Sequence, residues 1–173
     1  SSGIVSVEKY LEAQTDISEI KKQLSYPGIH HQNPLYQIFD QLFYGPKLYE
    51  KLFKIKSKFS ESGLIEQDDV ILNEKLLKLL QTKFDSKIAM VTGRGKQSVK
   101  YSLKEMLDEF DLNNSVFLED ESRELAKPNP QPLFDSIKGM GDGITLYVGD
   151  SMEDFIMAKK VTDMGSKVIF CGI

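Results

Sequence analysis

Short apolar runs and helical patterns alternate through the second half of the chain, and this alternation limits the possible folds more than any other feature. Apolar runs predict strands at residues 87–91, 115–118, 144–148 and 167–171. Apolar residues at helical spacing predict helices over residues 99–110, 132–138 and 153–162. Strands separated by helices indicate βαβ units, so the expected fold class is α/β, with a parallel sheet that carries helices on both faces.

The first half of the chain shows only helical patterns. Apolar residues recur at helical spacing over residues 17–24, 35–43, 48–53 and 72–80, and we expect no strand before residue 86. Asp16 is the expected N-cap of the first of these helices, and Gly45-Pro46 interrupts the pattern between the second and the third. We therefore predict two domains, a helical one over residues 1–83 and an α/β one over residues 84–173.

Composition argues against several function classes. The 173 residues carry 22 Lys and Arg against 26 Asp and Glu, whereas proteins that bind duplex nucleic acid usually carry a basic excess, so we expect no nucleic-acid partner. No apolar run reaches about 18 residues, so we expect no membrane partner either. Cys171 is the only cysteine, which rules out an intramolecular disulfide and a cage of cysteines around a metal. A reducing, cytoplasmic setting fits this composition.

Candidate functional residues follow the predicted strands, where ligands bind in open α/β sheets. Thr92 comes directly after the first strand, and Gly93, Arg94 and Gly95 lead into a helix. A hydroxyl, flexible glycines and the N–H groups at the start of that helix could together hold a phosphate. The alternative is a strand-to-helix turn that needs a flexible backbone.

A lysine next to two prolines is the second candidate. Lys127 follows the Glu119-Asp120 turn, and Pro128 and Pro130 restrict the backbone on its carboxyl side. An ammonium group held in this way can neutralise a phosphate or a carboxylate. The alternative is a solvated lysine in a proline-rich loop.

An acidic cluster gives the sharpest signal. Asp150, Glu153 and Asp154 lie at the carboxyl end of a predicted strand and at the start of a helix. Carboxylate oxygens suit Mg²⁺, which takes one or two carboxylates and keeps several waters. Ser151 and Asp154 also match a capping box, so Asp154 could serve the helix or a site. Asp150 has no capping role, which favours a functional one.

The order of hydroxyl, lysine and acid along the chain resembles the haloacid dehalogenase superfamily of phosphohydrolases, over about residues 84–173. Phosphoglycolate-phosphatase-like members are the nearest type. The resemblance implies a Rossmann-like parallel sheet, with the helical first half as an N-terminal α-helical cap. It also implies an Mg²⁺-dependent phosphatase that acts on a small phosphorylated metabolite through an aspartyl-phosphate intermediate.

The family's motifs assign a role to each candidate: catalytic Thr92 and Lys127, substrate-binding Gly93 and Arg94, and metal-binding Asp150 supported by Asp154. Thr92 would bind the transferring phosphoryl group, and Lys127 would neutralise it together with the nucleophile. Residues of the cap that could select the substrate, or could equally be surface and core residues, are Tyr26, His30, His31, Tyr36 and Tyr44.

The family's first motif, an Asp-x-Asp at the end of a central strand, does not occur in the chain. Its leading Asp is the nucleophile, and its strand lies between the strands that end near Thr92 and Asp150. A gap there would leave buried N–H and C=O groups unpaired, at about 1–3 kcal/mol each. We therefore expect the chain to be part of a longer protein whose first strand carries the nucleophile.

The lack of this motif is also compatible with two different kinds of protein. One is a divergent, non-catalytic member of the superfamily that serves as a binding or regulatory module. The second is a receiver-like domain, in which the phosphoacceptor Asp precedes the Thr. No acid closes a strand before Thr92, which counts against the receiver-like domain.

Overall fold

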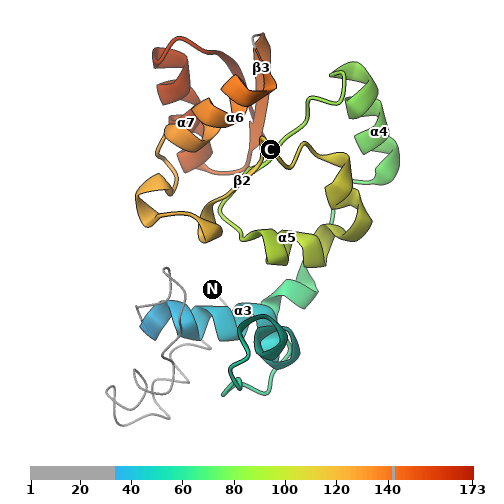
Figure 1. The fold of residues 1–173 in the computed structure, drawn as a ribbon, viewed down its shortest axis with the longest axis vertical. Coiled ribbons are helices and arrows are strands. Elements are labelled where there is room, and N and C mark those ends of the chain that lie inside the picture. The colour runs from blue at the N-terminus through green and yellow to red at the C-terminus, as the bar shows by residue number, and fades with distance from the viewer. Residues whose placement is uncertain (1–33, 142) are drawn as a thin grey trace. The chain divides into compact units, whose positions relative to one another are not determined.

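The computed structural model describes residues 34–141 and 143–173 (Figure 1). Contacts divide the chain into two compact units, residues 1–69 and residues 70–173. The predicted division into a cap of residues 1–83 and a core of residues 84–173 stays a prediction, because a division by contacts does not assign roles. Several predictions fall outside the described residues: the helix over residues 17–24 with its cap Asp16, Tyr26, His30, His31 and the side chain of Tyr36.

The described part of the first unit is helical. Helix α3 (Pro34–Phe53) contains Gly45 at φ 69° and Pro46, so it consists of two helical segments joined at a kink, and the predicted interruption is confirmed. A short 3-10 helix, η2 (Leu64–Gln67), packs against α3. Tyr44, Tyr49 and Ile65 form the buried centre of this unit. Tyr44 is therefore a core residue rather than an exposed one.

Two glycines bring the kink of α3 against the loop before η2. A Cβ atom built on Gly45 would lie 2.4 Å from the backbone nitrogen of Gly63. A Cβ atom on Gly63 would lie equally close to the carbonyl carbon of Tyr44, at 2.4 Å. Both distances are too short for any side chain, so only glycine allows the two backbones to approach in this way.

The second unit has the predicted α/β class. Its helices and strands are α4 (Glu74–Lys83), β1 (Val91–Thr92), α5 (Lys96–Leu103), β2 (Val116–Phe117), α6 (Gln131–Met140), β3 (Ile144–Gly149), α7 (Met152–Asp163) and β4 (Lys167–Gly172). Three short 3-10 helices complete it: η3 (Lys104–Glu109), η4 (Leu118–Asp120) and η5 (Arg123–Leu125). None of the helices in the described part of the chain is long and apolar enough to cross a membrane.

The strands pair in parallel, as predicted, but in two separate sheets. β1 pairs with β2, with Val91 opposite Val116. β3 pairs with β4 over six positions, from Ile144 opposite Lys167 to Gly149 opposite Gly172. The described residues contain no strand that joins these pairs, so the single continuous sheet expected from the sequence is not seen.

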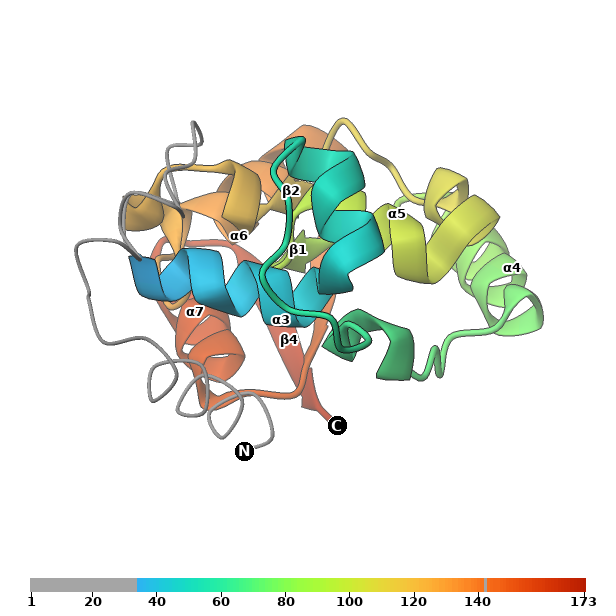
Figure 2. The same ribbon diagram turned by 90° about the horizontal axis from the view of Figure 1, so that it is seen from below.

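Helix α6 connects the two sheets through a shared core of side chains. Figures 1 and 2 show the position of this helix in the ribbon. Leu133 and Ile137 of α6 pack in one cluster with Tyr147 of β3, and Val91 of β1 packs against the same cluster. Helix α7 adds Met157, Ala158 and Val161, which are almost completely buried. The two strand pairs therefore share one hydrophobic layer, as parts of one sheet would.

Three predicted elements are shorter than expected, and one of them is the strand over residues 115–118, which is reduced to β2. The strand predicted over residues 87–91 is reduced to β1, because the side-chain oxygen of Ser115 accepts the hydrogen bond of the Met90 N–H, at 3.0 Å, where a neighbouring strand would supply a carbonyl. The helix predicted over residues 99–110 ends at Leu103, because Lys104 has φ 51°, and continues as 3-10 helix η3.

Candidate active site

The structure brings two of the predicted site residues into direct contact. Lys127, in the loop before α6, donates a hydrogen bond from Nζ to Oδ1 of Asp154 at 2.6 Å. Asp154 lies in the first turn of α7, directly after β3. The side chains of Lys127 and Asp154 are 17% and 3% exposed, so this is a largely buried ion pair.

Asp154 is held by more than the lysine. The hydroxyl of Tyr147 donates to the same Oδ1 atom at 2.6 Å, and the hydroxyl of Ser151 donates to Oδ2 at 2.7 Å. The Ser151 side chain also accepts from the Asp154 N–H, at 3.1 Å, which completes the predicted capping box. Both carboxylate oxygens therefore have protein partners, and the capping and site interpretations of Asp154 are compatible.

These contacts shift two acid–base equilibria. Burial raises the pKa of Asp154, but hydrogen bonds from Lys127, Tyr147 and Ser151 outweigh it and lower the pKa to about 2. Burial, the hydrogen bond to Asp154 and the charges of Asp154 and Asp150 raise the pKa of Tyr147 far above its usual value. At neutral pH the site therefore holds an ionised carboxylate and a protonated tyrosine.

Gly149, at the end of β3, leaves the space that Asp154 occupies. A Cβ atom on Gly149 would lie 2.6 Å from Cβ and 2.7 Å from Cγ of Asp154. We predict that Gly149→Ala displaces Asp154 and lowers the free energy of unfolding by about 1–3 kcal/mol, a range usual for overpacking. Urea unfolding followed by circular dichroism measures this loss. Gly93→Ala is the control, since a Cβ atom there meets nothing within 4 Å; equal stability of both variants would contradict the prediction.

Thr92, Gly93 and Arg94, the residues predicted to bind a phosphate, lie at the end of β1 and directly after it. Thr92 Oγ1 accepts a hydrogen bond from the Arg94 N–H at 3.2 Å, and Gly93 is exposed. The Arg94 guanidinium turns back along α5, where it donates to Oγ of Ser98 at 3.2 Å and to Oγ of Ser102 at 2.8 Å. Arg94 is thus fixed against the helix that follows it, α5, in this structure.

The start of α5 differs from the expectation that its N–H groups are available for a phosphate. The Gly95 N–H donates to Glu119 at 2.6 Å, and the Lys96 N–H donates to Asp120 at 2.8 Å. Carboxylates compete with a phosphate for such a positive helix end. The sequence indicates that Glu119 and Asp120 form a turn at the end of a strand. Nothing in the spacing of these residues indicates that they bond to the start of α5.

The acidic residues meet the requirements of Mg²⁺ in part. Asp150 is exposed directly after β3 and can supply one carboxylate. The oxygens of Asp154 are engaged by protein donors, so its support of a metal would be indirect. In the described ranges, no three acidic, histidine or cysteine side chains gather into a metal site. One carboxylate fits Mg²⁺, which is often bound through one or two carboxylates together with waters and substrate phosphate.

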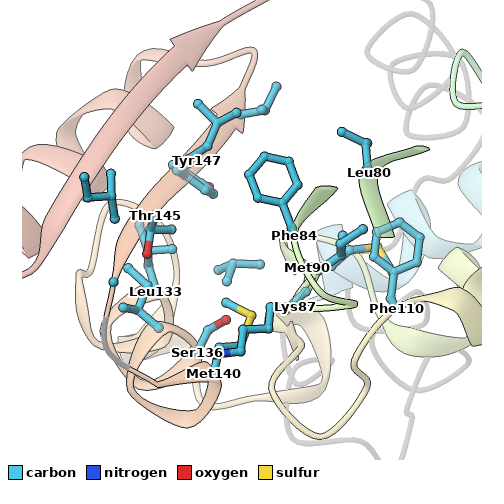
Figure 3. Close-up of a pocket in the computed structure, with 18 of the residues that line it drawn as sticks. Leu80, Phe84, Lys87, Met90, Phe110, Leu133, Ser136, Met140, Thr145 and Tyr147 are labelled. Atoms are coloured by element: carbon cyan, nitrogen blue, oxygen red, sulfur yellow. The ribbon is translucent and has the colours of Figure 1, made fainter. Parts of the chain in front are cut away.

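A cavity of about 420 Å³ separates the two sheets, and we call it the slot. Residues 87–92, leading into β1, line one side, and residues 143–148, including most of β3, line the other. Figure 3 shows Thr145 and Tyr147 on the β3 side, opposite Leu80 and Phe84 of the α4 region. Sequence analysis missed Tyr147 as a site residue; its position as the third residue before Asp150 on an apolar strand gave no signal.

Comparisons with known proteins give one match. A family model described as haloacid dehalogenase-like hydrolase matches residues 33–162, which is most of the chain. No curated protein and no solved structure matches the chain. The matched region includes Thr92, Lys127, Asp150 and Asp154.

Proposed function

Since the chain belongs to the haloacid dehalogenase-like hydrolases, we propose that it forms most of an Mg²⁺-dependent phosphatase that hydrolyses a small phosphate monoester. The observation that carries the proposal is the buried pair of Lys127 and Asp154, with Nζ and Oδ1 2.6 Å apart. An ammonium group held by a carboxylate beside the end of a strand is suited to stabilise phosphoryl oxygens. Phosphoryl transfer depends mainly on such positioning and charge stabilisation.

Lys127 is the main electrostatic group of the proposed site. Its ammonium group has three N–H donors, one of which is bonded to Asp154. Its other donors can therefore reach a phosphoryl oxygen and the nucleophile. Asp154 and Tyr147 determine where the ammonium group lies.

Thr92 and Asp150 complete the part of the site that this chain supplies. The Thr92 hydroxyl, at the end of β1, donates to a phosphoryl oxygen, and the exposed Gly93 permits close approach of the substrate. Asp150 holds Mg²⁺, which when bound neutralises phosphoryl charge. Arg94 contacts the substrate only after leaving Ser98 and Ser102.

The nucleophile comes from a strand that is not part of these 173 residues and that ends in Asp-x-Asp. The leading carboxylate attacks phosphorus, and the ester P–O bond breaks as the second Asp gives a proton to the leaving alcohol. Water then attacks the phosphorus of the aspartyl phosphate, which releases phosphate and restores the carboxylate. The proposal includes residues 1–83 as a cap that excludes bulk water, a phosphoglycolate-phosphatase-like substrate and a cytoplasmic setting.

A second candidate function is a non-catalytic binding or regulatory module on the same fold. The observation that favours it is the lack of any Asp-x-Asp in the 173 residues. The two functions can be distinguished by one measurement. The phosphatase predicts that the complete protein, with its Asp-x-Asp strand, hydrolyses a phosphate monoester, and the binding module predicts that it does not.

We predict that the complete protein hydrolyses p-nitrophenyl phosphate with Mg²⁺ and that Asp150→Ala lowers kcat by at least about a hundredfold, because the phosphoryl charge loses its metal. Glu153→Ala is the matched control, since Glu153 is an exposed acid three residues later, in the first turn of α7. Activity that survives Asp150→Ala would refute the metal assignment, and a complete protein that is inactive with Mg²⁺ would favour the binding module.

A further inference from the structure

The turn that follows β1 and the short helix that follows β2 leave the sheet next to each other. β1 and β2 are parallel, with Thr92 opposite Phe117, so both strands end at the same level (Figure 2). The chain continues from β1 as residues 92–95, which we call the phosphate turn because it carries the Thr92 hydroxyl. It continues from β2 as η4, whose last two residues are Glu119 and Asp120. The pairing of the strands therefore brings two carboxylates beside the phosphate turn.

Both carboxylates accept hydrogen bonds from backbone N–H groups where the phosphate turn meets α5. The Gly95 N–H donates to Oε2 of Glu119 at 2.6 Å, and the Lys96 N–H donates to Oδ2 of Asp120 at 2.8 Å. Hydrogen bonds to an ionised carboxylate are stronger than those between neutral groups. Gly95 is buried, so its N–H needs an acceptor from the protein, whereas Asp120 is exposed. Glu119 is therefore the more important of the two acids.

Gly95 leaves the space in which these carboxylates lie. A Cβ atom built on Gly95 would lie 2.7 Å from Oε2 of Glu119 and 3.0 Å from Oδ1 of Asp120. A side chain at this position would displace the Glu119 carboxylate from the N–H group that it accepts from. The close fit joins parts of the chain that are 24 residues apart.

Arg94 adds hydrogen bonds within its own part of the chain. Its N–H donates to Oγ1 of Thr92 at 3.2 Å, and its guanidinium donates to Oγ of Ser98 at 3.2 Å and to Oγ of Ser102 at 2.8 Å. These bonds lie within residues 92–102, so they shape the phosphate turn and its connection to α5. The bonds of Glu119 and Asp120 instead connect the phosphate turn to the end of β2 and thus set its place on the sheet.

We propose that Glu119 and Asp120 are positioning residues of the phosphatase, which fix the phosphate turn before the substrate binds. Neither acid touches the substrate; they act through the Thr92 hydroxyl and the backbone of Gly93. A turn that is already fixed loses little further freedom on binding, which strengthens the binding of a phosphoryl group in the substrate and of phosphate as the product. The identity of the ligand rests on the proposed function, whereas the fixing of the turn does not.

Steady-state kinetics of the complete protein test this role. Glu119→Ala should raise the KM for p-nitrophenyl phosphate and the Ki of inorganic phosphate by about tenfold each, because both ligands must then order the turn. The value of kcat should change by less than about threefold, because the bound substrate restores the turn. Glu119→Gln keeps an acceptor oxygen and should return both constants to within about threefold of the wild-type values.

Three kinetic results would overturn the proposal. A lower KM and Ki in Glu119→Ala would show that the carboxylate competes with phosphate instead of fixing the turn. Unchanged constants would show that the acid has no effect on the site. A loss confined to kcat would show that Glu119 acts on the chemical step.

Two control variants separate positioning from charge and from helix capping. Glu121→Ala removes an exposed acid directly after η4 and changes the net charge by the same amount. Asn73→Ala removes the side chain that accepts from the Leu76 N–H at 2.9 Å at the start of α4, a bond of the same kind on another helix. Both variants should keep KM and Ki within about twofold of the wild-type values. A change in either control as large as that in Glu119→Ala would overturn the proposal.

Amide hydrogen exchange of the 173-residue chain tests the turn without any activity. The Arg94 N–H is the best reporter, because it bonds to Thr92 and not to a carboxylate. Glu119→Ala should speed its exchange at least about tenfold and leave residues 144–149 unchanged, which also shows that the variant is folded. Unchanged exchange at Arg94 would overturn the proposal even if the complete protein is an active phosphatase. Faster exchange, with a complete protein that is inactive with Mg²⁺, would support the fixing of the turn and count against the phosphatase.

Discussion

Replacing Lys127 by methionine in the complete protein is expected to lower kcat by about 10²–10³-fold, the loss usual when one donor to a developing negative charge is removed. Methionine keeps the length of the side chain but carries no charge, so the transferring phosphoryl group loses its cation. Steady-state hydrolysis of p-nitrophenyl phosphate measures the effect. Lys159→Met, which removes an exposed lysine of α7, is the control and should change kcat less than about twofold. Equal losses in both variants would show that Lys127 has no specific role.

Replacing Asp154 by asparagine is expected to lower the free energy of unfolding by about 3 kcal/mol, because it leaves the largely buried Lys127 without its counter-charge. Urea unfolding followed by circular dichroism measures this loss in the 173-residue chain. Asp150→Asn is the matched control, since it makes the same chemical change at an exposed acid four residues earlier and should cost no more than about 0.5 kcal/mol. Similar losses from both substitutions would rule out a special contribution of the ion pair.

The ion pair of Lys127 and Asp154 also makes the free energy of unfolding depend on pH. The pKa of Asp154 is about 2 in the folded chain and about 3.9 in an unfolded one, so the folded state favours the ionised form. The contribution of ionised Asp154 to the free energy of unfolding is fully present above about pH 4 and is lost as the pH falls toward about 2. Asp154→Asn should remove this part of the acid dependence. An unchanged acid profile in the variant would show that other carboxyl groups cause it.

Much of the second unit could be predicted because its elements follow from neighbouring residues. The parallel strands, the order of α6, β3, α7 and β4, and the capping box of Ser151 and Asp154 all depend on spacings of a few residues. The same holds for the kink at Gly45-Pro46, where a single φ of 69° interrupts α3. Local spacing is visible in a sequence without knowledge of the fold.

The contacts that build the site could be predicted only in part. Lys127 and Asp154 are 27 residues apart, and their proximity was implied by the family resemblance rather than by their own pattern. The bonds of Glu119 and Asp120 to the start of α5 span 24 residues and depend on the path of the loop after β2. Tyr147 lies in an apolar run like any other strand residue. The sequence therefore did not indicate that its hydroxyl donates a hydrogen bond to Asp154.

The arrangement of β3, α7 and β4 has a consequence for the order of folding. These three elements pair with one another within residues 144–172, so their contacts require only short loop closures, and we expect them to form early. The strand that we propose outside this chain can pair only with sheets that have already formed, so we expect it to join last. Until then the nascent protein exposes apolar strand edges, and this interval is when a chaperone would be needed most.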